Sequence, residues 1–421
     1  MMYRIIAIAL VLFSVALAPT TVSAAQNTCN ISDLVSLHSC FSHVRDYDVF
    51  AFTGDLRCTS EGDCCPGGHA PMLFQSVSGK EIDGNGHSFR REAGQHACPA
   101  IVILKASHIT MKDLVLDEDA KVPPCDFSER DCPNTIKTAS SRDIRLDAIR
   151  VYAGKGYVVS VWATDGFTFT RSTISDAGII GLSVGHYKFG PSRNITITDS
   201  VFARTRTNAI ALQGAYSSDP AHPVLVANNV LVDNHWHGVF PVPGVPGGVT
   251  TGGQLFVGDG ENIRVTGNII AGHPCDNCYR AHHVTGIEIV DMLPAPAGVH
   301  GLQIDHNLII GTNESSSAMN QHPNPLVSDV AISDNRVIGY DLLDTGTANA
   351  SHARNSVRAA PLAPLPAAAA LARSPQPGAP ATPVFLCARK ATATQHFTST
   401  AKDCGGDGEI VGVLGFPAAT N

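Results

Sequence analysis

The sequence predicts an all-β chain folded as a right-handed parallel β-helix, with an N-terminal helical cap and a small disulfide-closed C-terminal module. The first observation is a recurring phrase in which apolar residues alternate and a small polar residue precedes another apolar pair. Alternation with period two predicts strands with one face inward, and recurrence every ~25–40 residues predicts a solenoid of stacked units. The clearest copies are ITITDSVF (195–202), VLVANNVL (224–231), IRVTGNII (263–270), LQIDHNLI (302–309) and VAISDNRVI (330–338).

A column of small polar residues is the second observation. Aligning the copies places six side chains at one position of the coil: Ser172, Ser200, Asn229, Asn268, Asn307 and Asn335. Asn at a turn can hydrogen-bond to its neighbours along the stack and satisfy backbone groups that the bend leaves unpaired. The strands are therefore expected to stack in parallel, and the rule for parallel crossover connections predicts a right-handed coil.

The composition suits this fold and argues against one class of partner. The chain is 44% apolar and only 16% charged, with 38 Gly, as expected for strands joined by tight turns. Its net charge of −8 argues against nucleic acid as a partner and gives no overall attraction to polyanions, so an acidic substrate would need a local basic patch. Residues 1–25 have the pattern of a secretory signal, with Arg4, an apolar run over 5–18 and small residues at 22–24. That run is shorter than the ~18 apolar residues of a membrane span, so we expect the protein to be secreted to the extracellular or periplasmic space. We also expect it to be a monomer.

Twelve cysteines behind a secretory leader indicate disulfides. Eight lie before residue 133, two share one loop at 275 and 278, and two lie near the C-terminus. Cys387 and Cys404 are expected to pair, because their segment holds no other cysteine. Pairing among the first eight stays open.

Shifts in composition divide the chain after the leader into four parts. Residues 26–75 are expected to form an N-terminal cap, with a helix inside 31–44 that starts at Ser32 as its N-cap. Residues 76–345 form the β-helix, residues 346–383 an Ala/Pro-rich linker, and residues 384–421 a small module that moves independently on that linker. Loops inserted between the coils are expected to bind ligands, since they can vary without unfolding the scaffold.

The segments IDGNGH (82–87) and ASHITMKDL (106–114) resemble the opening of β-helices in the pectin-lyase-like superfamily. The resemblance covers about residues 75–345 and implies this fold, with a long polysaccharide lying in a groove along one parallel sheet. It implies no particular activity: the segment VWATDG (161–166) lacks the His of the pectate-lyase motif, and the polygalacturonase motifs are absent. Residues 384–417 resemble a short module of unknown function in bacterial secreted proteins, through Phe385, Cys387, His396, Phe397, Cys404, Glu409, Gly412, Gly415 and Phe416.

One sheet of the coil is expected to carry the functional site. The segments GIIGLSVGHYK (178–188), NAIALQG (208–214), HGVFPV (237–242) and TGIEIVD (285–291) are predicted to be its neighbouring strands, with Leu182, Ile210, Val239 and Ile287 inward. Polar and aromatic side chains then gather on the outer side and at the strand ends. The predicted catalytic residues are Arg206, His237, His235, Lys188 and Glu288, and the predicted substrate-binding residues are Arg204, Gln213, Trp236 and Phe240.

This set of side chains fits β-elimination from a uronic acid. The reaction needs a cation to neutralise the carboxylate, a base to remove the C5 proton and an acid for the leaving oxygen. The arginines and the lysine can neutralise, either histidine can transfer protons near neutral pH, and the two aromatic rings can stack on a sugar. The predicted function is therefore an exported lyase of a uronic-acid-containing polysaccharide.

Three other functions stay open: a non-catalytic glycan-binding or adhesive protein, a polyuronate epimerase, which shares the first proton abstraction, and a glycoside hydrolase. Hydrolysis needs two carboxylates ~5–9 Å apart, and Glu288 with Asp291 is the pair available here.

No metal ligand is assigned. Asp117, Glu118 and Asp119 are oxygen ligands of the kind that can hold Ca²⁺, and a solvated acidic turn is the plainer interpretation. The Cys275-x-x-Cys278 pair has metal-ligand spacing, but a disulfide is expected in an exported protein.

Overall fold

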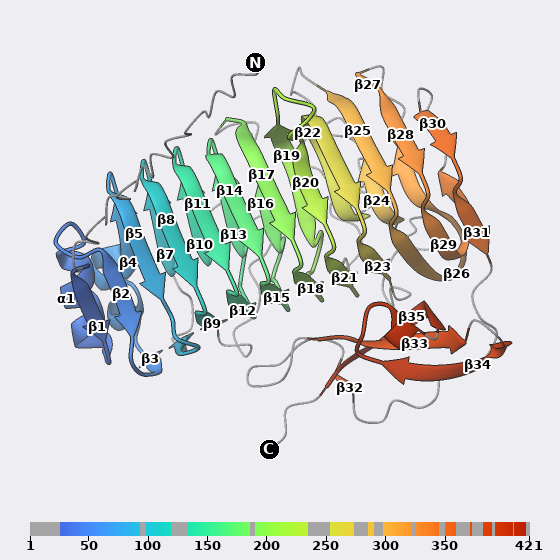
Figure 1. Ribbon diagram of the computed structural model, residues 1–421. Helices are drawn as coiled ribbons and strands as arrows, with labels where there is room; N and C mark the ends of the chain where they lie inside the picture. Colours follow the sequence, from blue (N-terminus) through green and yellow to red (C-terminus); the bar gives the residue numbers. More distant parts are fainter. Residues whose placement is uncertain are drawn as a thin grey trace, which may run out of the picture.

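The chain forms a long coil of stacked parallel strands (Figure 1). The computed structural model describes residues 26–92, 98–118, 134–185, 190–234, 253–272, 285–289, 298–321, 326–344, 350–358, 371–372, 382–389, 392–406 and 408–417. Within the coil, each inner strand pairs with a strand one coil earlier and a strand one coil later. The pairings stack the strands into three sheets, named here in the order in which the chain first visits them.

The first sheet contains β1 (Thr28–Ile31), β2 (Val49–Phe52), β5 (Ser78–Asp83), β8 (Ser107–Lys112), β11 (Arg142–Asp147), β14 (Asp165–Thr170), β17 (Ser192–Thr198), β20 (Val224–Ala227), the end of β22 (Gly253–Thr266), β25 (Val299–Asp305), β27 (Val327–Ser328), β28 (Val330–Ser333) and β30 (Ala350–Ala353). The second contains β3 (Leu56–Cys58), β6 (Ser88–Arg91), β9 (Val115–Glu118), β12 (Arg150–Tyr152), β15 (Thr173–Ser175), β18 (Val201–Ala203), β21 (Val230–Val232), β23 (Ile269–Ala271), the start of β26 (Leu308–Gln321), the start of β29 (Arg336–Asp344) and β31 (Ser356–Arg358). The third contains β4 (Met72–Gln75), β7 (Ile101–Leu104), β10 (Ile136–Ala139), β13 (Val159–Trp162), β16 (Leu182–Val184), β19 (Ile210–Tyr216), the start of β22, β24 (Thr285–Ile289), the end of β26 and the end of β29.

Alternate residues of these strands point into the coil and form one continuous core. In β14 and β18, Phe167, Phe169 and Phe202 are fully buried. Each repeated phrase supplies one strand of the first sheet and, after a corner, one strand of the second. ITITDSVF, for example, spans the end of β17 and the start of β18. The predicted right-handed parallel β-helix is confirmed.

The predicted column of polar residues lies at the corner between the first and second sheets. The backbone N–H of Ser200 donates to Oδ1 of Asn229 at 3.0 Å, and that of Asn229 donates to Oδ1 of Asn268 at 2.9 Å. Asn307 and Asn335 continue the pattern, and all these side chains are buried. The ladder therefore pairs backbone groups that the corner removes from the strand pairing.

The parallel ladder is longer than predicted at both ends. β2 already pairs with β5, so coils begin inside the segment expected to be a cap. At the other end, β30 and β31 pair with β28 and β29 and extend the coil to residue 358, beyond the boundary expected at 345. The Asn ladder extends with it, since Asn335 donates to Oδ1 of Asn355.

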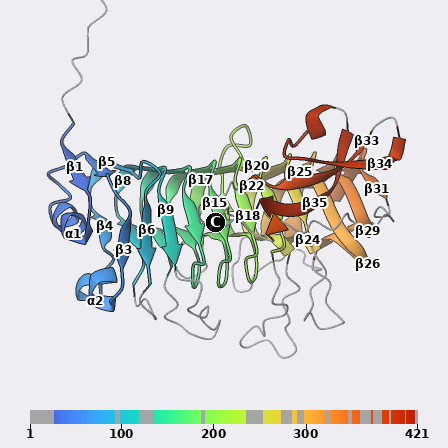
Figure 2. The same ribbon diagram turned by 90° about the horizontal axis from the view of Figure 1, so that it is seen from below.

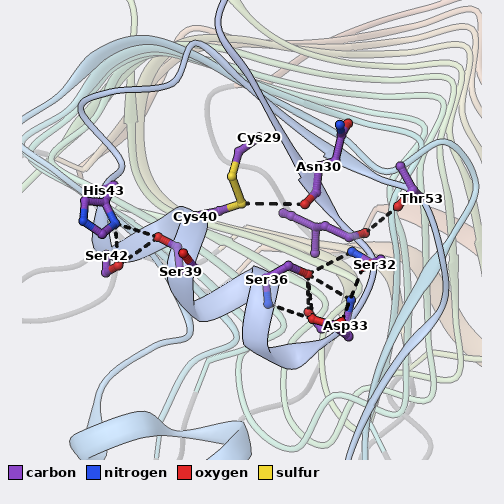
Figure 3. Close-up of a disulfide and its surroundings, with 11 residues drawn as sticks. Cys29, Asn30, Ser32, Asp33, Ser36, Ser39, Cys40, Ser42, His43 and Thr53 are labelled. Carbon is purple, nitrogen blue, oxygen red and sulfur yellow. Dashed lines mark hydrogen bonds between the residues drawn. A yellow bond between two sulfur atoms is a disulfide. The ribbon is translucent and has the colours of Figure 1, made fainter.

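The helix α1 (Leu34–Ser42) covers the N-terminal end of the coil, as predicted, and Phe41 packs on Phe50 with ring centroids 4.7 Å apart. Its N-cap is Asp33 rather than Ser32: Oδ1 of Asp33 accepts from the backbone N–H of Ser36 at 2.7 Å (Figure 3). A carboxylate caps well because its oxygen pairs with an otherwise unsatisfied N–H of the first turn. A second helix, α2 (Glu61–Cys64), and a 3₁₀ turn, η1 (Pro66–Gly68), follow. None of the helices in the described ranges is long and apolar enough to cross a membrane.

Four disulfides lie in the described part of the chain. Cys29–Cys40 ties β1 to α1 (Figure 3), and Cys58–Cys64 and Cys65–Cys98 hold the segment around α2. The predicted pair Cys387–Cys404 is confirmed, with Cα atoms 6.0 Å apart. Cys125, Cys132 and the expected pair Cys275–Cys278 lie outside the described residues.

The C-terminal module is an antiparallel sheet of β33 (Val384–Arg389), β34 (Thr392–Ser399) and β35 (Gly408–Pro417), with the short β32 (Leu371–Ala372) beside β35 and the 3₁₀ turn η2 (Cys404–Gly406). It lies against the later coils (Figures 1 and 2) and buries Phe385 and Ile410 on the outer side of the second sheet. Glu409 pairs with Arg336 at 3.0 Å and with Arg358 at 3.0 Å. The prediction that this module moves independently of the β-helix is therefore wrong: its apolar residues complete a shared cluster.

Candidate functional site

The outer side of the third sheet carries a row of side chains, one from each coil. In register, the row consists of Leu73, Val102, Lys137, Ser160, Ser183, Ala211, Phe256, Glu288 and Asn320. Members on β4, β7 and β10 are half-buried, whereas those from β13 to β24 are buried. This sheet therefore has an open part in the early coils and a covered part in the later ones.

Glu288 is the charged residue of the covered part. Its side chain is 2% exposed although it points away from the core of the coil. One carboxylate oxygen accepts a hydrogen bond from the backbone N–H of Gly253 at 3.0 Å, and the side-chain amide of Asn208 donates to the carbonyl of Gly253 at 2.6 Å. A side chain at position 253 would meet the backbone nitrogen of Glu288 at 2.6 Å, so Gly253 lets three neighbouring coils meet at this point.

Further polar groups are buried where the same strands begin. The amide nitrogen of Asn234 donates to the side-chain oxygen of Gln254 at 3.1 Å, and Oδ1 of Asn234 accepts from the backbone N–H of Thr205 at 3.0 Å. The side-chain nitrogen of Gln254 is buried without a hydrogen-bond partner among the described residues. A buried, unsatisfied amide costs free energy, so this nitrogen is a candidate to bind a polar group of a ligand or a water molecule.

The arginines predicted for the site lie beside this cluster. Arg204 occupies the corner between the second and third sheets, with φ of 54°, and its Nε donates to Asp176 at 3.0 Å. Arg206 is half-buried, and its backbone N–H donates to the carbonyl of Ala177 at 2.9 Å. Arg206 lies two residues before Asn208, whose side chain contacts Gly253 beside Glu288.

Gln213 lies at the other end of β19, on the outer side, and is half-buried. It pairs with Asp259 of β22, where the register shifts. Burial raises the pKa of the Tyr216 hydroxyl, and a hydrogen bond with Asp259 raises it further. Gln213 thus lies toward the end of β19, where the chain leaves the third sheet, and not in the Glu288 cluster.

Five predicted site residues lie outside the described residues: Lys188, His235, Trp236, His237 and Phe240. The strand expected at 237–242 is misplaced, however. The position expected for Val239 belongs to Leu255 of β22, which pairs with Ile210 and Ile287, and Phe256 has the outward position expected for Phe240. The physical reason is Pro241, which has no N–H to donate to the ladder of a central strand.

A hollow in the open part of the third sheet was not predicted. It measures about 420 Å³ and crosses four strands, with Leu73, Val102 and Leu104 among its lining residues. Nζ of Lys137 lies 4.9 Å from the centroid of the Trp162 ring, and both side chains line the hollow. Burial lowers the pKa of Lys137, and no described carboxylate offsets this. Alternation in TIKTA (135–139) indicates that Lys137 points outward, but only the pairing between coils places it near Trp162.

The two described acidic residues considered for Ca²⁺, Asp117 and Glu118, are consecutive in β9 and lie on opposite sides of this strand. Both oxygens of Glu118 accept from the Arg91 guanidinium, at 3.0 and 3.1 Å, in a buried pair. Asp119 lies outside the described residues, and among those described no group of three or more His, Cys, Asp or Glu has metal-binding geometry.

Comparison with known proteins supports the fold and not an activity. No protein-family model and no curated protein matches the sequence. The structure is similar to a GH136 lacto-N-biosidase from Eubacterium ramulus, with 9% identity over 79% of this chain and 68% of that chain and a TM-score of 0.53. It also matches the A-module of mannuronan C-5 epimerase AlgE4 from Azotobacter vinelandii, with 13% identity over 79% of this chain and 93% of that chain and a TM-score of 0.47. A third match is the surface adhesin PfbA of Streptococcus pneumoniae, with 11% identity over 79% of each chain and a TM-score of 0.48. At these identities the likeness shows the β-helix fold alone, and the resemblance of the C-terminal module stays a prediction.

Proposed function

We propose that this protein is an exported lyase that binds a uronic-acid-containing polysaccharide along the outer side of the third sheet and cleaves it by β-elimination. The observation that carries the proposal is the burial of Glu288 and Gln254 outside the core, with the half-buried Asn208 beside them, at one edge of three neighbouring coils. Polar groups buried outside a core, at the edge where long insertions leave the scaffold, are typical of a binding site.

The disulfides of the described residues support export, because such bonds persist in oxidising compartments. The sheet itself supports a linear ligand. Strands stack ~4.8 Å apart, so the coil offers a repeated series of positions to a repeated chain of sugars.

The chemical roles follow the predicted set. Arg206 neutralises the uronate carboxylate and makes the C5 proton more acidic. One of His235 and His237 removes that proton, the electron pair forms the C4–C5 double bond, and the C4–O bond breaks. The other histidine protonates the leaving oxygen. Glu288, held by the N–H of Gly253, binds sugar hydroxyls or orients a histidine at the same edge.

The test is incubation of the purified protein with a panel of polyuronates while following the ultraviolet absorbance of the unsaturated product. Rising absorbance with one substrate supports the lyase. Exchange of the C5 hydrogen with solvent deuterium, without rising absorbance, would replace the lyase by an epimerase. Binding with neither change would leave a non-catalytic glycan-binding protein, and new reducing ends without unsaturation would indicate a hydrolase.

A further inference from the structure

We infer that the hollow at Lys137 and Trp162 is a separate binding subsite for the carboxylate-bearing sugar of an acidic polysaccharide, remote from the Glu288 cluster. The inference rests on the proposed function for the identity of the ligand as an acidic glycan. It adds a site that the predicted catalytic and binding residues do not include.

The first argument is the charge at the hollow. Lys137 has its ammonium half-buried above the Trp162 ring, and among the described residues it forms no ion pair. A cation over an aromatic ring is stabilised only modestly by the ring. A positive charge partly removed from water is stabilised by a counter-charge, so an anionic group of a ligand would bind favourably beside Lys137. A carboxylate is the anion that a sugar chain can supply.

The second argument is the shape and lining. A volume of about 420 Å³ lies in the range of roughly 300–1,000 Å³ that is usual for small-ligand pockets. Aliphatic side chains of Leu73, Val102 and Leu104 line the hollow together with Trp162. The C–H face of a sugar ring can pack on such surfaces, while the exposed His69 and Gln75, which also line the hollow, can hydrogen-bond to hydroxyls.

The third argument is that the walls are fixed. The segment Gly68 to Ala70 and Pro99 line the hollow, and the disulfide Cys65–Cys98 joins the chain just before each. The Arg91 guanidinium also donates to the carbonyl of Cys98 at 3.0 Å. A preformed pocket loses less entropy when a ligand binds.

The position of the hollow says what the subsite does. Lys137 and Glu288 belong to the same outward row, separated by five strand spacings from β10 to β24. At ~4.8 Å per spacing, this is about 24 Å. Only a chain several sugars long can reach both, so the subsite strengthens binding of long substrates and leaves the reacting sugar unaffected.

The experiment uses calorimetric titration of the full-length protein with galacturonate, mannuronate and glucuronate trimers and with the same trimers after reduction of their carboxyl groups. Lys137→Met keeps the side-chain length and removes the charge. It is expected to weaken binding of the preferred acidic trimer by at least about tenfold. Lys105→Met, at an exposed lysine that does not line the hollow, is the matched control and should bind as wild type. Trp162→Phe should weaken acidic and reduced trimers alike.

The outcomes separate this inference from the proposed activity. Wild type that binds the acidic trimer, with Lys137→Met weakened and no turnover of any polymer, supports the subsite and rejects the lyase. Turnover of a polymer with unchanged trimer binding by Lys137→Met rejects the subsite alone. With turnover, Lys137→Met should raise KM for the polymer at unchanged kcat, and this difference should vanish for oligomers too short to span about 24 Å. No binding of any acidic trimer by wild type would overturn the subsite.

Discussion

The side-chain nitrogen of Asn229 donates to Oδ1 of Asn268 at 3.0 Å, and the same oxygen also accepts the backbone N–H of Asn229. Asn268 in turn donates to the carbonyl of Val226 and to Oδ1 of Asn307. Each amide of the ladder therefore joins its own coil to the coils on both sides, inside a buried corner.

Asn268→Ala removes an acceptor for two donors and should lower the free energy of unfolding by about 3 kcal/mol, because each unsatisfied buried group costs ~1–3 kcal/mol. The measurement is urea unfolding followed by far-ultraviolet circular dichroism. Gln303→Ala, at an exposed outward position of β25, is the control and should change little. Equal stability of the two variants would show that the ladder does not stabilise the coil.

The buried pair of Arg91 and Glu118 gives a second stability prediction. Arg91→Met leaves the Glu118 carboxylate buried without its partner and should destabilise by about 3–5 kcal/mol. The double variant Arg91→Met with Glu118→Leu removes both charges and should regain most of that loss. Denaturant unfolding of the three proteins tests this. A double variant as unstable as the single one would mean that the hydrogen bond from Arg91 to the carbonyl of Cys98, and not the ion pair, holds the region.

Asp305 predicts part of the acid sensitivity. Burial raises the pKa of Asp305, but hydrogen bonds from Arg264, Thr266 and His306 outweigh it and lower the pKa to about 2, below the ordinary value of 3.8. The folded state therefore binds this proton less readily than the unfolded state. Above pH 4 the lowered pKa stabilises the folded state by about 2 kcal/mol, and this stabilisation is lost as the pH falls through 2. Asp305→Asn should be less stable at pH 6 and should lose less stability between pH 4 and 2, measured by the urea midpoint at each pH. Identical slopes for both proteins would contradict this.

The proposed lyase predicts that three substitutions reduce turnover without unfolding the protein. Arg206→Ala and His237→Ala remove the neutralising cation and a proton-transfer group, so kcat/KM should fall at least about 100-fold. Glu288→Gln keeps the volume and removes the charge, and should also reduce turnover. Thermal unfolding of Arg206→Ala and His237→Ala is the control for folding and is expected to shift little. Full activity in both would move the chemistry to another part of the chain.

The repeat predicted the ladder and the strands of the first two sheets because each copy contains its own period-two alternation and its own corner residue. It did not predict where the third-sheet strand resumes after a long insertion. Two segments after β21 could supply the next strand of the third sheet: HGVFPV (237–242) and GQLFVG (253–258). GQLFVG is the start of β22, and its Leu255 pairs with Ile210. The hollow was missed for a related reason: Lys137 and Trp162 are distant in sequence and meet only through the register between β10 and β13.

The docking of the C-terminal module has a consequence for biogenesis. A solenoid can nucleate at one end and grow coil by coil, and α1 with its disulfide offers such a start at the N-terminus. The outer side of β18, β21 and β23, with Ala203, Val230 and Ile269, stays exposed to water until β33 has been synthesised and has docked. The growing chain therefore exposes an apolar surface that only its last residues cover. Chains that end before residue 384 are expected to aggregate through this surface.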